Sequence, residues 1–233
     1  METQRQSKSG SPALRSFELD SLAWWKRSGI WIVLLLLLPI GFIDRPLKRH
    51  DLANLRKSVS NARQIGLALS EFERQYGSYP DAASVAKIRK QTDTDMKLGT
   101  ASSNEFFRQL LALNIAPGES MFYANISGTH KPDNDFAGAK ALAKGECGFT
   151  YFLGASKYSN PKRPVAVTPM IPGTDRFDRK PFDGKAVVLW SDTSVSSIHI
   201  RQDGCAILGT SALMETSNPV WGGEPPVVVW PEL

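Results

Sequence analysis

Four aspartates in the carboxyl-terminal part of the chain have the side chains that could bind a cation. Asp175, Asp178 and Asp183 share one stretch that is rich in turn-forming residues, and Asp192 follows nine residues after the last of them. Calcium takes roughly six to eight oxygen ligands, and carboxylates are common donors. The spacing does not match an EF-hand, and the basic residues Arg176, Arg179 and Lys180 alternate with the first three aspartates. We therefore favour a solvated loop with local salt bridges and expect no cofactor, with calcium bound by these aspartates as the alternative.

Residue types suited to catalysis are scarce. The chain has three histidines and two cysteines, and it lacks the nucleophile-elbow, zinc-protease and phosphate-loop motifs. We therefore expect a protein that is not an enzyme. Cys147 and Cys205 form one even pair that could be a disulfide in an oxidising compartment. Two buried thiols are the alternative, and the sequence leaves both open.

The composition is typical of one globular domain with an appendage. The 233 residues are 42% hydrophobic, with 28 Lys and Arg against 23 Asp and Glu. Residues 44–233 carry 23 basic and 20 acidic residues, an excess too small for the electrostatic footprint of a nucleic-acid-binding domain. We expect no nucleic-acid partner.

An apolar stretch without a charged residue runs from Gly29 to Ile43. As a helix it would be about 22 Å long, and including Trp24 and Trp25 brings it to about 30 Å, the thickness of a bilayer core. We expect a transmembrane anchor at residues 28–43, preceded by a disordered, basic, cytoplasmic leader at residues 1–27. The expected anchor residues are Trp31, Leu34, Leu36, Leu38, Pro39 and Phe42.

A secretory signal peptide is the alternative to an uncleaved anchor. The apolar stretch is followed by no pair of small residues that a signal peptidase would recognise, which favours the anchor. Basic residues are nearly balanced on its two sides, so the positive-inside rule does not fix the orientation. Long domains cross the membrane largely regardless of charge. We therefore expect a single-pass protein of the cell inner membrane with a periplasmic carboxyl-terminal domain.

A long amphipathic stalk helix is expected within residues 44–80. Apolar or small residues recur every three or four positions from Leu52 to Tyr76, Pro46 suits a first helical turn, and Gly77 suits the stop. The following residues 81–233 are expected to form a globular α+β head. Asp81 and Ser102 are expected to cap two short helices, the second with Glu105 in a capping box. The expected strands are 121–126, 148–153, 165–170, 186–190, 195–200 and 227–229.

The end of the stalk helix resembles one family. The sequence NARQIGLALSEFERQYGSYP, with aromatic residues at Phe72, Tyr76 and Tyr79 around Gly77, resembles the pseudopilins of type II secretion systems and related type IV pilin-like proteins. The hairpin GKAVVLWSDTSVSSI and the tract near NPVWGGEPP resemble a subgroup with an enlarged head. The family usually has a Gly-Phe cleavage junction and a Glu early in its helix, whereas here no acidic residue lies between Asp20 and Asp44.

The resemblance implies a pilin-like fold, in which a transmembrane helix leads into an amphipathic helix packed on a small antiparallel sheet. It implies a non-catalytic structural component of a type II secretion or pilus-like apparatus, whose partners are the membrane and other pilin-like subunits or secretion-system proteins. The alternative is an anchored periplasmic binding module that does not polymerise. Its ligand would lie among Trp190, Trp221 and Trp230, which are equally suited to a core.

Overall fold

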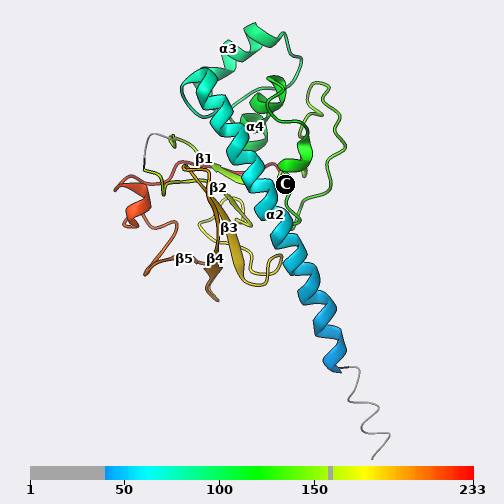
Figure 1. Cartoon of the computed structure of the whole chain (residues 1–233), viewed down its shortest axis with the longest axis vertical. Helices are drawn as coiled ribbons and strands as arrows, with labels where there is room; N and C mark the ends of the chain where they lie inside the picture. Colours follow the sequence, from blue (N-terminus) through cyan, green and yellow to red (C-terminus); the bar gives the residue numbers. More distant parts are fainter. Residues whose placement is uncertain (1–39, 157–159) are drawn as a thin grey trace, which may run out of the picture. The chain divides into compact units, whose positions relative to one another are not determined.

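The structure is a computed structural model that describes residues 40–156 and 160–233. The chain divides into two units, residues 1–47 and residues 48–233. The second unit is an α+β domain in its described part, with helices followed by an antiparallel sheet. Figure 1 shows the long helix α2 running alongside the strands, with α3 and α4 near its carboxyl-terminal half.

Helix α2 (Ile40–Tyr76) is the stalk helix that the periodicity predicts. Its end is as expected: Gly77 has a φ of 83°, a conformation that glycine adopts readily, and its N–H donates to the carbonyl of Glu73 at 2.7 Å. The expected start at Pro46 is wrong, because α2 already includes Ile40, the first residue that the structure describes. A proline removes one N–H donor from a helix but does not always end it.

The two short helices have the predicted caps. Helix α3 (Ala82–Thr92) starts after Asp81, whose side chain forms a capping box with Ser84. Helix α4 (Ser103–Ala112) starts after Ser102, which accepts from the N–H of Glu105 at 3.3 Å. The Glu105 carboxylate does not return to Ser102; it accepts from the N–H of Ala101 instead, at 2.8 Å.

The sheet has seven antiparallel strands in the order β6-β5-β4-β3-β2-β1-β7. Its strands are β1 (Thr150–Phe152), β2 (Pro164–Thr168), β3 (Lys185–Trp190), β4 (Val195–Ile200), β5 (Ala206–Leu208), β6 (Ser211–Ala212) and β7 (Val228–Val229). Five of the six expected strands are confirmed within a few residues, including the hairpin of β3 and β4. The very short β5 and β6 were not predicted.

Both faces of the sheet are buried at its strands β1, β2 and β3, whereas β4 is largely half-buried or exposed. On one face, Val187 and Leu189 of β3 pack in a core with α2 and α4. On the other face, Val188 and Trp190 pack with the irregular segments near Phe177 and around residues 213–221. The alternation along β3 divides its side chains between the two cores. The sheet therefore carries the stalk helix on one side and carboxyl-terminal loops on the other.

The expected strand at residues 121–126 is wrong. A 3-10 turn, η1 (Glu119–Met121), occupies its beginning. The side-chain amide of Asn61 on α2 donates to the carbonyls of Ser120 and Tyr123 at 2.8 and 2.7 Å. These carbonyls bind a helix side chain, and the apolar residues Met121 and Phe122 fill the helix-side core. An apolar run can thus be buried without joining a sheet.

The predicted anchor lies almost wholly outside the described residues. This is true of the leader and of Trp31, Leu34, Leu36, Leu38 and Pro39, while Phe42 lies within the bounds of α2. Among the helices that the structure describes, none combines the length and the apolar character needed to cross a bilayer.

Candidate functional site

Helix α2 lies directly against the β3–β4 hairpin at Gly66. A Cβ atom placed there would lie 2.9 Å from Cδ1 of Leu189 and 3.4 Å from Cβ of Thr193, so glycine lets the helix approach the β3–β4 hairpin. Ile65, Leu69 and the other core-facing residues of this half of α2 are almost fully buried. The stalk helix and the sheet therefore form one packed body.

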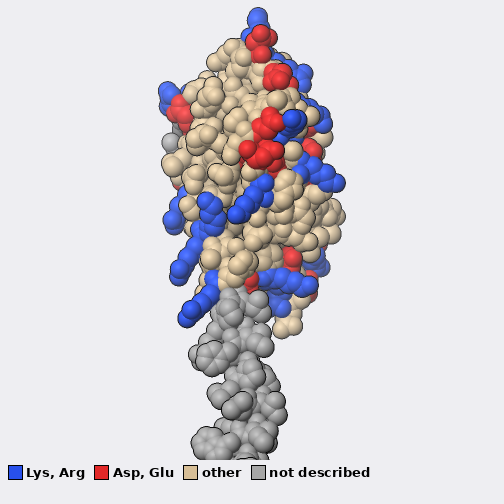
Figure 2. Space-filling view, turned by 90° about the vertical axis from the view of Figure 1, so that its right-hand side faces the viewer, with Lys and Arg blue, Asp and Glu red and all other residues tan. Residues whose placement is uncertain are grey.

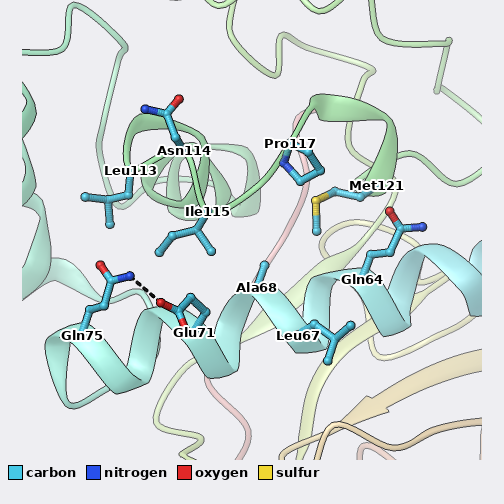
Figure 3. Close-up of a pocket in the computed structure, with 10 residues that line it drawn as sticks. All are labelled: Gln64, Leu67, Ala68, Glu71, Gln75, Leu113, Asn114, Ile115, Pro117 and Met121. Carbon is cyan, nitrogen blue, oxygen red and sulfur yellow. Dashed lines mark hydrogen bonds between the residues drawn. The ribbon is translucent and has the colours of Figure 1, made fainter.

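The side of α2 that faces away from the sheet borders an open groove of about 470 Å³ (Figure 3). Leu67 at its edge is 68% exposed. Ile115 points toward Ala68 across the groove, and Glu71 accepts a hydrogen bond from Gln75 on the helix at 2.7 Å. The groove is lined by Gln64, Leu67, Ala68, Glu71, Gln75, Leu113, Asn114, Ile115, Pro117 and Met121. It offers a partly apolar surface on the stalk helix.

The end of α4 shapes the far wall of this groove. Asn114 follows the helix with a φ of 54°, the left-handed conformation that asparagine tolerates better than most residues. The N–H groups of Ile115 and Ala116 both donate to the carbonyl of Leu110, at 3.0 and 3.1 Å. This turn brings Ile115 over the stalk helix (Figure 3).

The structure does not bring the four predicted calcium ligands together. Asp183 precedes β3 and Asp192 follows it, so six strand residues separate them, or about 20 Å at the usual rise. Asp175 is exposed and pairs with Arg176 at 3.1 Å. Asp178 accepts from the N–H of Lys180 at 2.9 Å.

Asp192 has a structural task in the hairpin turn. Its carboxylate accepts from the N–H of Ser194 at 2.9 Å and lies 3.4 Å from the ammonium group of Lys162. A calcium site made of Asp175, Asp178, Asp183 and Asp192 is therefore wrong, because a strand and local partners hold these carboxylates apart.

Of the two alternatives for the cysteines, the structure does not support the disulfide, because Cys147 and Cys205 are buried free thiols. Cys147 lies in the helix-side core with its sulfur 3.7 Å from the hydroxyl of Ser103. Burial raises the pKa of its thiol to about 12. Cys205 lies beside Arg176, whose guanidinium donates to its sulfur at 2.6 Å. The thiol alternative is the one that the structure supports.

The three tryptophans belong to the packed core and its edge. Trp221 is 1% exposed, and its indole N–H donates to the carbonyl of Leu213. Trp190 is buried and donates to the hydroxyl of Ser196 at 2.9 Å. Trp230 is partly buried against the same cluster. The expectation that they line a ligand pocket is not supported by these contacts.

An acidic cluster that the sequence did not reveal joins three distant residues. One carboxylate oxygen from each of Glu119, Asp133 and Glu146 lies within 4.8 Å of the others. These are the described residues whose spacing could hold a divalent cation. The two glutamates are buried and Asp133 is exposed.

The two glutamates hold the loop between them in place by accepting hydrogen bonds from its backbone. Glu119 accepts from the N–H groups of Leu142 and Asn134 at 2.5 and 2.8 Å. Glu146 accepts from those of Asp133 and Ala143 at 3.1 and 2.6 Å. Buried backbone donors need such partners because an unpaired one is costly. The sequence did not predict this acidic cluster, because its residues are 13 or more positions apart and follow no ligand motif.

Burial raises the pKa of the Glu119 carboxyl above its ordinary value. The N–H of Leu142 lowers it, the charges of Glu146 and Asp133 raise it, and the N–H of Asn134 lowers it, with a net upward shift. The folded state thus favours the protonated form. The stability that Glu119 contributes is fully present below its ordinary pKa of 4.5 and is lost as the pH rises through the raised value.

Replacing Glu119 with glutamine tests this assignment. Glu119→Gln should lower the free energy of unfolding by about 1–3 kcal/mol, because the amide nitrogen cannot accept one of the two backbone bonds. The loss of stability should be larger near pH 4 than near pH 7, because only the wild type has a carboxyl group at position 119 that can be protonated. Chemical unfolding of the full-length protein in detergent at both pH values measures it, with the exposed Glu215→Gln as control. A loss that grows with pH would contradict the assignment.

Comparison with known proteins found no similar protein: no protein-family model, no curated protein and no solved structure matches this chain.

Proposed function

We propose that this chain is a membrane-anchored, pilin-like subunit, a non-catalytic structural component of a type II secretion or pilus-like apparatus. The apolar stretch Gly29–Ile43 would anchor it in the inner membrane, with the head outside the cytoplasm. The observation that carries the proposal is the one-sided burial of α2, whose core-facing stripe packs on an antiparallel sheet while Leu67 stays exposed. A rod of this kind holds a head on a stalk and leaves one side open to neighbours.

The groove beside α2 supports a contact with another subunit. An exposed leucine next to Leu113, Ile115 and Met121 makes a partly apolar surface on the stalk. Burying apolar side chains at a contact between subunits stabilises that contact, because water is released from their surface. We propose that the partner is another pilin-like chain, which would place an apolar helix side against this groove.

Membrane fractionation of the full-length chain tests the anchor. The protein should stay in the membrane pellet after an alkaline carbonate wash, and protease should reach its head once the outer membrane is opened. Leu34→Arg combined with Leu36→Arg should move it to the soluble fraction, because each charge costs about 2.5–3.5 kcal/mol in a bilayer centre. Leu52→Arg, a leucine-to-arginine change within α2, is the matched control.

Two results would overturn the proposal. One is wild-type protein in the soluble fraction, and the other is a head that protease reaches only after the inner membrane is broken. Mass spectrometry of the amino terminus completes the test. An intact Met1 indicates an uncleaved anchor, a new end near Gly29 indicates prepilin-type processing, and one near Phe42 indicates a cleaved signal.

A further inference from the structure

A second cavity, of about 530 Å³, lies between α2 and the loop that contains residues 120–132. Lys57 lines it from the helix and Lys131 lines it from the loop. Both lysines are exposed, and neither forms an ion pair with any residue that the structure describes. Two cations from different segments thus face one cavity without a bound counter-charge.

Polar groups between the lysines complete the lining. Asn125 donates to the side-chain oxygen of Asn54 at 3.3 Å, and the amide nitrogen of Asn54 donates to Nδ1 of His50 at 3.2 Å. Because Nδ1 accepts this bond, the proton of a neutral His50 lies on Nε2, where it can donate to a ligand. Tyr123 adds a hydroxyl group. Among the described lining residues there is no carboxylate.

The acidic residues that are nearest along the chain, Asp51 and Asp133, do not line the cavity. Asp51 lies beside His50, with its carboxylate 3.7 Å from Nδ1. This is the ring nitrogen that also accepts a hydrogen bond from Asn54. Asp133 belongs to the acidic cluster and accepts from the N–H of Asp135 at 2.8 Å. Neither lines the cavity. The lining therefore consists of cations and hydrogen-bond donors, which is the chemistry that binds an oxyanion.

Within residues 48–233, the excess positive charge is concentrated on α2, near the cavity. Residues 48–63 contain five Lys or Arg and one acidic residue, whereas residues 64–233 contain 17 Lys or Arg and 18 Asp or Glu. Figure 2 shows several Lys and Arg side chains at the lower end of the described surface, while acidic and basic groups alternate above. Such a concentration attracts anions to one end of the molecule.

We propose that this cavity, which we call the cationic pocket, binds the phosphate group of an anionic phospholipid headgroup. Lys57 and Lys131 provide the charge, and His50 and Tyr123 provide hydrogen-bond donors. The lipid source rests on the proposed membrane anchor: Lys57 lies 14 residues, or about 21 Å along a helix, beyond the apolar stretch, so the stalk must tilt toward the bilayer for a headgroup to reach the pocket. A cavity of this volume is within the usual range for a small ligand, roughly 300–1,000 Å³.

Hydrogen exchange of the full-length protein in nanodiscs tests the proposal. Discs of phosphatidylcholine alone are compared with discs that also contain phosphatidylglycerol. Exchange in residues 120–132 should slow by about tenfold in the anionic discs, the factor that a ligand at ten times its Kd gives. Lys57→Gln with Lys131→Gln should weaken binding about 30-fold and abolish this protection. Lys87→Gln with Lys90→Gln on α3 removes the same charge away from the pocket and should retain it.

Each remaining outcome decides a separate point. Equal protection in neutral discs, or full protection in the double pocket variant, would overturn the cationic pocket. Protection by millimolar inorganic phosphate in neutral discs, without an effect of phosphatidylglycerol, would keep a phosphate site and overturn the lipid source. If the chain does not insert into discs, the proposed anchor fails, and phosphate titration of the soluble chain still tests the pocket.

Discussion

Replacing Arg108 with methionine should lower the free energy of unfolding by about 3 kcal/mol or more. Arg108 is 2% exposed, and its guanidinium donates to the carbonyls of Ala141, Lys97 and Leu142. Methionine has a similar length but no donor, so the carbonyls of Ala141 and Lys97 would lose this partner, while that of Leu142 would keep only the amide of Asn104 at 2.9 Å. Each buried group left without one costs about 1–3 kcal/mol. Arg108 therefore links α4 to two loops, one at Lys97 and one at Ala141 and Leu142, which do not belong to the sheet.

Two further variants separate hydrogen bonding from charge at this position. Arg108→Lys keeps the charge but cannot copy the fork of donors, so it should recover less than half of the loss. Arg63→Met removes an exposed arginine from α2 and should change stability by less than about 0.5 kcal/mol. Chemical unfolding of the full-length protein in detergent measures all three. Wild-type stability in Arg108→Met would show that the three carbonyls do not depend on this side chain.

Truncating Phe72 to alanine should cost about 3–5 kcal/mol, the usual range for a buried phenylalanine. Phe72 is fully buried between α2 and the head, and its ring stacks on Tyr76 with centroids 4.7 Å apart. The deletion would leave a cavity where the stalk helix meets the core. Phe72→Leu, which fills most of the space, should cost less.

Leu67→Ala is the matched control on the same helix. Because Leu67 is 68% exposed, its truncation should change the free energy of unfolding by less than about 0.5 kcal/mol. The contrast between the two positions, measured by thermal or chemical unfolding, tests which side of α2 faces the head. A large loss at Leu67 with a small loss at Phe72 would mean that the helix packs with its other side.

The parts of the fold that local chemistry determines were predictable from the sequence. Gly77 ends the stalk helix because it accepts a positive φ, and Asp81 starts α3 because its carboxylate caps a free N–H. The β3–β4 hairpin followed from two β-branched arms around one turn. The stripe from Leu55 to Phe72 became the core face of α2.

The features that depend on distant partners were not predictable. Residues 121–126 look like a strand, but Asn61 binds the carbonyls of Tyr123 and of the preceding Ser120, which only the folded chain brings within reach. Glu119 and Glu146 are brought together by a loop whose path cannot be predicted from any short sequence motif. The proposed cationic pocket likewise joins Lys57 and Lys131 across 74 residues of sequence. The four aspartates are close in sequence, but strand β3 separates Asp183 from Asp192, so they do not meet in space.

A photo-crosslinking residue in place of Leu67, in the full-length chain in the membranes of the cells that produce it, tests the proposed subunit role most directly. We expect adducts with a second copy or with another chain that has an apolar amino-terminal helix, identified by mass spectrometry. The same group at the exposed Thr216 should give none of them. Adducts no stronger at Leu67 than at Thr216, with the protein present in the membrane, would contradict it.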